Sequence, residues 1–176
     1  LGKGSGKANT AQYNSFMGYQ AGFKNTSGGS NVFIGNQAGY NNSTGEFNVS
    51  VGYKAGFTAS TSYNTFVGYQ AGYSNSTGQQ NVFLGYNAGF SNTQSWSNVF
   101  LGTNSGYSNR SGSANVFIGE HTGYSNLYGY RNVFIGWYAG EKNTGEISGI
   151  GGCVNVFIGT ESGRNNLTGY SNVFIG

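Results

Sequence analysis

A unit of about 17 residues recurs along the whole chain, and this repeat constrains the fold more than any other feature. The unit has the form N-V-F-I-G-x-x-A-G-Y-x-N-x-T-G-x-x, and successive copies begin 17, 17, 16, 17, 17, 17, 17, 23 and 17 residues apart. A fixed period of this kind predicts a solenoid, in which each unit is one coil that packs on its neighbours. The copies open at Asn14, Asn31, Asn48, Asn64, Asn81, Asn98, Asn115, Asn132, Asn155 and Asn172.

The residues of the unit indicate β structure. Helical repeat units are longer than 30 residues, and the 33 glycines among the 176 residues would interrupt helices in every unit. The run Asn-Val-Phe-Ile-Gly is β-branched and aromatic, which is typical of a strand, and we expect a second short strand around Ala-Gly-Tyr. The sequence therefore predicts an all-β fold, a parallel β-solenoid (β-roll) of stacked 17-residue coils about 4.8 Å apart.

The two irregular spacings locate a surface loop. One unit loses a residue near Ser60 and another gains six within 146–154, so both changes fall in the same half of the unit. We therefore predict a lead-in segment at 1–13 and a single repeat domain at 14–176 of about nine to ten coils, with an inserted loop that protrudes at 146–154. Since the final unit stops after its strand at Gly176, we expect the chain to be a fragment of a longer one.

Both faces of the predicted strand are apolar. Side chains alternate along a strand, so Val32 and Ile34 point one way while Phe33 points the other. A thin coil has one interior, so only one of these two rows can be packed there. Because an exposed Phe stripe would aggregate, we expect another chain to cover it. The predicted oligomer interface is the ladder Phe33, Phe66, Phe83, Phe100, Phe117, Phe134, Phe157 and Phe174.

A second aromatic column and a set of Asn-x-Ser/Thr motifs are candidate binding and modification sites. The column fails at Glu141 and Arg164, where burial would strand a charge, so we place it at a rim of the coil. Its candidate ligand-facing residues are Tyr40, Tyr73, Tyr107 and Tyr124. The motifs match N-glycosylation acceptors, although turn chemistry also explains them and is the favoured interpretation. They lie at Asn25, Asn42, Asn75, Asn109 and Asn166.

The core motif V-F-I-G-x-x-A-G resembles the V-A-I-G-x-x-A-x-A repeat in the heads of trimeric autotransporter adhesins, and similar repeats occur in phage tail fibres and large bacterial surface proteins. The resemblance covers the chain from Tyr13 to Gly176. It implies a left-handed parallel β-roll in a homo-oligomer, with a trimer favoured, and an extracellular location on a bacterial cell surface or virion fibre. Because Phe replaces the family's small residue, a bulkier trimer core or a different oligomer could follow.

The charged residues are too few and too scattered for several classes of function. The chain has no Asp, which excludes the Asp-based Ca²⁺ repeats of other β-rolls. Isolated Lys and Arg argue against nucleic-acid binding, and no apolar run approaches the roughly 20 residues that cross a membrane. The groups left for catalysis or metal binding form no recognisable motif, so we expect no enzyme activity and no cofactor. They are Glu46, Glu120, Glu141, Glu146, Glu161, His121 and Cys153, with Glu120 and His121 expected in a solvated turn.

These observations favour a structural role, as an extracellular fibre or adhesin segment that projects from a cell or virion surface and mediates attachment. Its expected partners are further copies of itself and a host surface, matrix or glycan. The alternative is a carbohydrate-binding module that stacks sugars on the aromatic rims. A remote alternative is an ice-binding solenoid, but the Thr residues lie in the loop half and are interrupted by Gln94 and Tyr128.

Overall fold

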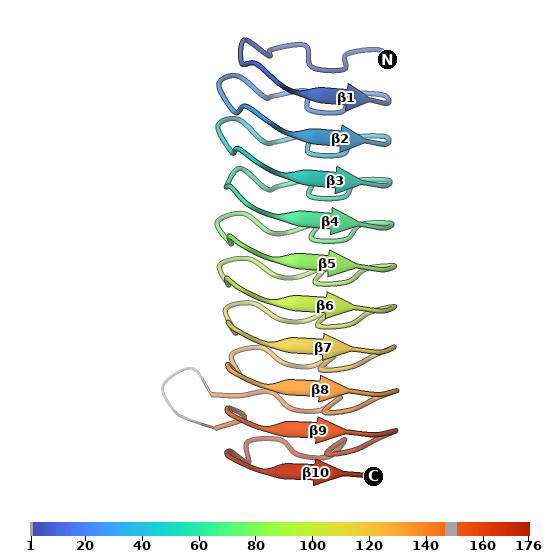
Figure 1. Cartoon of the computed structure of the whole chain (residues 1–176), viewed down its shortest axis with the longest axis vertical. Helices are drawn as coiled ribbons and strands as arrows, with labels where there is room; N and C mark the ends of the chain where they lie inside the picture. Colours follow the sequence, from blue (N-terminus) through green and yellow to red (C-terminus); the bar gives the residue numbers. More distant parts are fainter. Residues whose placement is uncertain (1, 147–150) are drawn as a thin grey trace.

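The computed structural model describes residues 2–146 and 151–176 and is an all-β parallel solenoid of about nine coils of about 17 residues each, as predicted. Each coil contributes one three-residue strand, and the strands form a single parallel sheet in chain order (Figure 1). The strands are β1 (Ser15–Met17), β2 (Val32–Ile34), β3 (Val49–Val51), β4 (Thr65–Val67), β5 (Val82–Leu84), β6 (Val99–Leu101), β7 (Val116–Ile118), β8 (Val133–Ile135), β9 (Val156–Ile158) and β10 (Val173–Ile175).

The repeat fixes the register, because every strand residue pairs with its own copy in the next coil. Phe83 pairs with Phe100 between β5 and β6, and the same register holds across the 23-residue unit, where Phe134 pairs with Phe157. The extra residues are inserted after Asn143. Its side-chain amide donates to the carbonyl of Gly152, nine residues on, whereas the corresponding bond from Asn126 to Gly129 spans three residues. The predicted inserted loop at 146–154 stays a prediction, because its residues 147–150 lie outside the described part of the chain.

The segment around Ala-Gly-Tyr is a turn, so the prediction of a second strand there is wrong. The glycine of this segment has a positive φ, +58° at Gly39, which breaks an extended conformation. Neighbouring coils still bond to each other here, since Gly22 N donates to Ala38 O at 2.9 Å. The turn therefore forms the second wall of the coil without being a strand.

The Phe ladder lies inside the coil, so its prediction as the oligomer interface is wrong. The rings stack on one another with centroids 4.7–5.2 Å apart, interrupted only between β2 and β4, where Ser50 takes the position. Phe174 in β10 is 43% exposed, whereas the other members of the predicted interface are at most 1% exposed: Phe33, Phe66, Phe83, Phe100, Phe117, Phe134 and Phe157.

Glycine on the opposite wall makes room for these rings. A Cβ on Gly106 would lie 2.4 Å from the Phe100 ring, and one on Gly39 would lie 2.6 Å from the Phe33 ring. The residues before these glycines, Ser105 and Ala38, are also fully buried. The interior is therefore a Phe stack against a wall of Gly preceded by a small residue (Ala, Ser or Thr), and Val and Ile point outward.

The described residues of the lead-in segment follow the path of one more coil. Gly6 N donates to Ala21 O at 2.9 Å, and Gln20 N donates to Lys3 O at 3.0 Å, as in the coils that follow. The side chain of Asn9 also accepts from Asn25 Nδ2 at 2.7 Å. Residues 2–9 thus belong to the solenoid rather than to a separate segment.

The residue before each strand-opening Asn adopts a left-handed backbone, and Val154 is the one β-branched residue found there, at φ +58°. This conformation costs an L residue about 1–2 kcal/mol and suits Asn better. We expect Val154→Asn to raise the free energy of unfolding by about 1 kcal/mol, because the side chain is 46% exposed and loses little packing. Urea denaturation measures the change. Ser97→Asn, at the same φ, is the control and should gain less; equal gains would contradict the argument.

Candidate functional site

The outward face of the sheet is the most distinctive surface of the protein. Its rows are partly exposed, with Val82, Val99 and Leu101 at 37%, 38% and 43%. None of the outward residues is charged, and all but Ser15 and Thr65 are apolar. We call this surface the apolar sheet face, and it consists of Ser15, Met17, Val32, Ile34, Val49, Val51, Thr65, Val67, Val82, Leu84, Val99, Leu101, Val116, Ile118, Val133, Ile135, Val156, Ile158, Val173 and Ile175.

Exposed aromatic side chains border the apolar sheet face along one edge. They directly follow the Gly that closes the strand and are 40–51% exposed at Tyr19, Tyr53, Tyr69, Tyr86 and Trp137. Three of them stack in consecutive coils, with centroids 5.1 Å apart from Tyr53 to Tyr69 and from Tyr69 to Tyr86. This border widens the apolar surface and gives it polar hydroxyl tips.

Two buried columns of Asn tie the coils together. The strand-opening Asn98 donates its backbone N–H to Asn81 Oδ1 at 3.0 Å and its amide to Gly112 O at 3.0 Å. The loop Asn126 donates to Asn109 Oδ1 at 2.8 Å and to the carbonyl of Gly129 at 3.0 Å. The amide ladder predicted at the strand openings is confirmed, and a second one runs through the loops.

The candidate glycosylation sites belong to this second ladder, which agrees with the favoured turn interpretation and argues against the glycan-acceptor alternative. Four of them, Asn25, Asn42, Asn75 and Asn109, are at most 1% exposed. Their amide nitrogen, which would carry the glycan, instead donates hydrogen bonds within the loop. Asn166 is half-buried and bonded in the same way, to Asn143 Oδ1 at 2.9 Å and Gly169 O at 3.1 Å.

The short coil interrupts the loop ladder. Ala59 takes the Asn position there, and the buried Oδ1 of Asn42 in the preceding coil has no hydrogen-bond partner in the described structure. The loop after Ala59 is one residue shorter, and the carbonyl of Thr61 takes the place that a Gly carbonyl has in most other coils, accepting from Asn48 Nδ2 at 2.7 Å. The missing residue and the missing Asn therefore fall in the same loop.

The second aromatic column lies at a rim, as predicted, but its ring faces are covered. Tyr40 lies 5.2 Å from both Phe23 and Phe57, and Tyr73 and Tyr107 likewise have a ring on each side. Tyr124 ends the stack, and burial raises the pKa of its hydroxyl above its ordinary value. A sugar ring stacks on an open aromatic face, so Tyr40, Tyr73 and Tyr107 present edges and hydroxyls rather than stacking platforms.

Arg164, Glu141, Glu161 and His121 lie around Tyr138 near the end of this column. Arg164 donates to Glu141 at 2.6 Å and to Glu161 at 2.8 Å, and its guanidinium lies 4.7 Å from the Tyr138 ring. His121 is stacked on Tyr138 at 4.8 Å, so it is less solvated than we predicted. Within residues 2–146 and 151–176, no group of three or more His, Cys, Asp or Glu could hold a metal ion.

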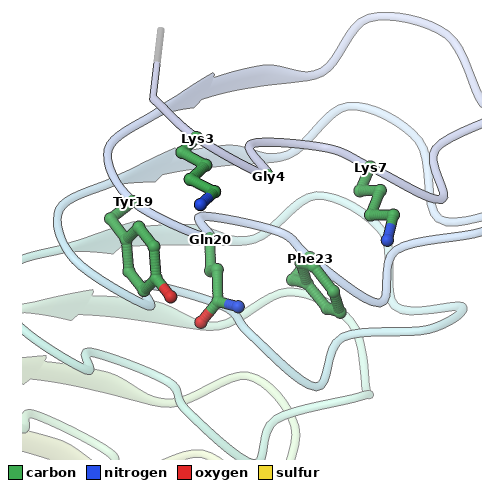
Figure 2. A pocket seen from close by; sticks show the side chains of 6 residues that line it. All are labelled: Lys3, Gly4, Lys7, Tyr19, Gln20 and Phe23. Carbon is green, nitrogen blue, oxygen red and sulfur yellow. The ribbon is translucent and has the colours of Figure 1, made fainter.

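Cys153 is buried, and two exposed lysines line a hollow at the first coil. Cys153 is 1% exposed, and burial raises the pKa of its thiol. Figure 2 shows a hollow in which Lys3 lies above Gln20 and Lys7 above Phe23, with the rings of Tyr19 and Phe23 on either side of Gln20. Its volume is about 430 Å³, and both lysines are exposed, so their charges are shared with solvent.

A second hollow lies between the loops before β5 and β6. It has a volume of about 310 Å³ and is lined by Thr77, Gln79, Gln80 and Trp96. Sequence reasoning missed it, because a single Trp at a variable position of the repeat carries no periodic signal. The position is variable, and aromatic residues also occur there as Tyr130 and Tyr170, so the usable signal is only that Trp96 is the one Trp at this position.

The part of the chain that the structure describes contains no helix of the length and hydropathy needed to span a bilayer. Comparisons of the chain with known protein families, with characterised proteins and with solved structures find no match.

Proposed function

We propose that this chain is a structural segment of an extracellular fibre or adhesin whose copies associate side by side through the apolar sheet face, with a trimer favoured. The observation that carries the proposal is an uninterrupted, in-register stack with one long uncharged apolar face. Its location on a bacterial cell or virion surface is supported by the resemblance of V-F-I-G-x-x-A-G to the repeat of autotransporter heads.

The hydrogen bonding supports a stiff rod. Each coil is joined to the next through its strand, as where Val99 N donates to Asn115 O at 2.9 Å. The wall opposite repeats this, with Gly89 N donating to Ser105 O at 2.9 Å, and both Asn ladders run in parallel with these bonds. Bending the rod would strain bonds on several sides of a coil at once, which suits a part that holds something away from a surface.

The size of the apolar sheet face supports lateral association. Ten strands spaced about 4.8 Å apart, each about 10 Å long, give a face of roughly 500 Å² on one chain. Two such faces would bury about 1,000 Å², which is the lower bound for a specific interface, and the aromatic border adds to it. Because the face has no charged residue, association carries no free-energy cost for the desolvation of ions. Apolar patches of this size on soluble proteins mark interfaces.

Placing charges on the apolar sheet face should therefore dissociate the protein. In sedimentation velocity the wild type is expected at a multiple of its 18.5 kDa chain mass, with three chains favoured. Val82→Lys combined with Leu101→Lys should shift it to the monomer, because each interface would then bury several unpaired ammonium groups. Both side chains are partly exposed in one chain, so a lysine there can extend into water and circular dichroism should be unchanged.

The matched control adds the same two charges elsewhere on the same coils. Gln94→Lys combined with Ser111→Lys lies on exposed loop positions and should leave the sedimenting mass unchanged. A wild-type chain that sediments as a monomer at about 100 μM, a concentration at which interfaces of this size are normally occupied, would overturn the proposal.

A further inference from the structure

The hollow before β5 and β6 combines an exposed indole with neutral polar side chains. Trp96 is 59% exposed, and the other lining residues are Thr77, Gln79 and Gln80. A large apolar ring left in water adds little to the stability of the fold. We propose that this hollow binds a neutral pyranose sugar, with the ring of Trp96 as the platform for the sugar's apolar face.

The coil itself does not require an aromatic residue at this position. The corresponding residues of the coils above and below are Gln79 and Ser113, and no aromatic ring of the described chain stacks on Trp96. This distinguishes Trp96 from Tyr40 and the other members of the rim column, which have a ring on each side. The indole thus keeps an open face, which a ring of another molecule can cover.

The backbone under the hollow is fixed before any ligand arrives. Trp96 N donates to Ser113 Oγ at 3.2 Å, and its carbonyl accepts from Ala114 N at 3.0 Å. On the other side Ser97 N donates to Gln79 O at 3.1 Å, and Ser97 Oγ donates to Gln80 Oε1 at 3.3 Å. A site tied to both neighbouring coils loses little conformational entropy on binding.

The lining selects the chemical class of the ligand. A pyranose has an apolar C–H face and a rim of hydroxyls that both donate and accept hydrogen bonds. The amides of Gln79 and Gln80 and the hydroxyl of Thr77 also donate and accept, which matches that rim. The four lining side chains are uncharged, which favours neutral sugars over sialylated or sulfated ones. The volume of about 310 Å³ is at the lower end of ligand sites, which suits a small sugar.

This inference is independent of lateral association. Trp96 and its three neighbours lie on loops outside the apolar sheet face, so a monomeric chain would present the same hollow. Failure to bind sugar would leave the sedimentation result untouched, and a monomeric mass would leave the sugar site intact.

The two tryptophans of the chain provide a matched pair of fluorescent reporters. Trp137→Phe leaves Trp96 as the single indole, whereas Trp96→Phe leaves Trp137, which is 48% exposed. Each variant is titrated with methyl β-glucoside, methyl β-galactoside, methyl α-mannoside and N-acetylglucosamine. We expect a saturable change in emission of Trp137→Phe with at least one sugar, with a dissociation constant of about 1 mM or weaker, and none in Trp96→Phe.

A third variant tests the polar part of the site. Adding Gln79→Ala to Trp137→Phe should weaken binding about five- to tenfold, the effect of one lost hydrogen bond. The proposal is overturned by equal responses of the two single-tryptophan variants or by no response to any of the four sugars. It is also overturned if a proline-rich peptide, the other common ligand of exposed aromatic grooves, saturates the signal while the sugars do not.

Discussion

Phe117→Ala is expected to lower the free energy of unfolding by about 3–5 kcal/mol, the range found for large aromatic-to-alanine changes in a core. The ring of Phe117 is fully buried and lies 4.9 Å from both Phe100 and Phe134. It also fills the space beside Gly123, where a Cβ would lie 2.5 Å from the ring. Removing it leaves a cavity that a glycine wall cannot fill, because no side chain there can move in.

Urea denaturation followed by circular dichroism measures this loss, and Val116→Ala is the matched control. Val116 is the neighbouring residue in β7 and points outward, where it is only partly buried. Its truncation should cost under about 1.5 kcal/mol, because little packing is removed. If Val116→Ala destabilised the monomeric chain as much as Phe117→Ala, the assignment of Phe to the interior would be contradicted.

The period, the position of each strand and the parallel register could all be predicted from the sequence, because a tandem repeat stacks like residues on like residues. Which strand face points inward could not be predicted from alternation alone, since Val32 and Phe33 are both apolar. The deciding residue is Gly39, six positions after Phe33, whose missing Cβ makes room for the ring. The Gly that follows each of the strands β1–β9, preceded by Ala in six of them, was the available signal for this wall.

Some surface properties could be predicted from the sequence and others could not. An exposed apolar row was predicted, and the structure assigns exposure to Val and Ile rather than to Phe. The Asn-x-Ser/Thr motifs matched a modification pattern, but the feature that matters is the Gly three residues after the Asn, as from Asn126 to Gly129. Trp96 was not predicted as a site residue because Trp occurs at this position in one coil, and analysis of a repeat identifies only residues that recur.

The loop Asn ladder gives the second large effect, because Asn126→Asp keeps the shape of the side chain and removes its donor. Asn126 is fully buried, and its amide donates to Asn109 Oδ1 at 2.8 Å and to Gly129 O at 3.0 Å. A carboxylate at this position cannot donate, so its oxygens would face the acceptors Asn109 Oδ1 and Gly129 O, and its charge would be buried. At pH 7 we expect a loss of at least about 3 kcal/mol, since each unsatisfied buried group costs about 1–3 kcal/mol.

The loss should depend on pH in a direction that identifies its cause. Burial raises the pKa of the introduced carboxyl in the folded state above its ordinary value of about 3.9, so the folded chain holds the proton to higher pH than the unfolded chain does. Stability therefore falls as the pH rises from about 4 through the folded-state pKa, and part of the loss should be recovered at pH 4.

Asn36→Asp adds the same charge at an exposed turn position and should change stability by less than about 0.5 kcal/mol at either pH. Urea titrations of both variants and the wild type at pH 4 and pH 7 separate the cost of the lost hydrogen-bond donor from the cost of the buried charge. A loss in Asn126→Asp that is the same at both pH values would assign the whole effect to the missing donor. A loss no larger than that of Asn36→Asp would show that the ladder does not hold the coils together, because a buried carboxylate between two acceptors cannot be neutral to folding unless the loop opens to water.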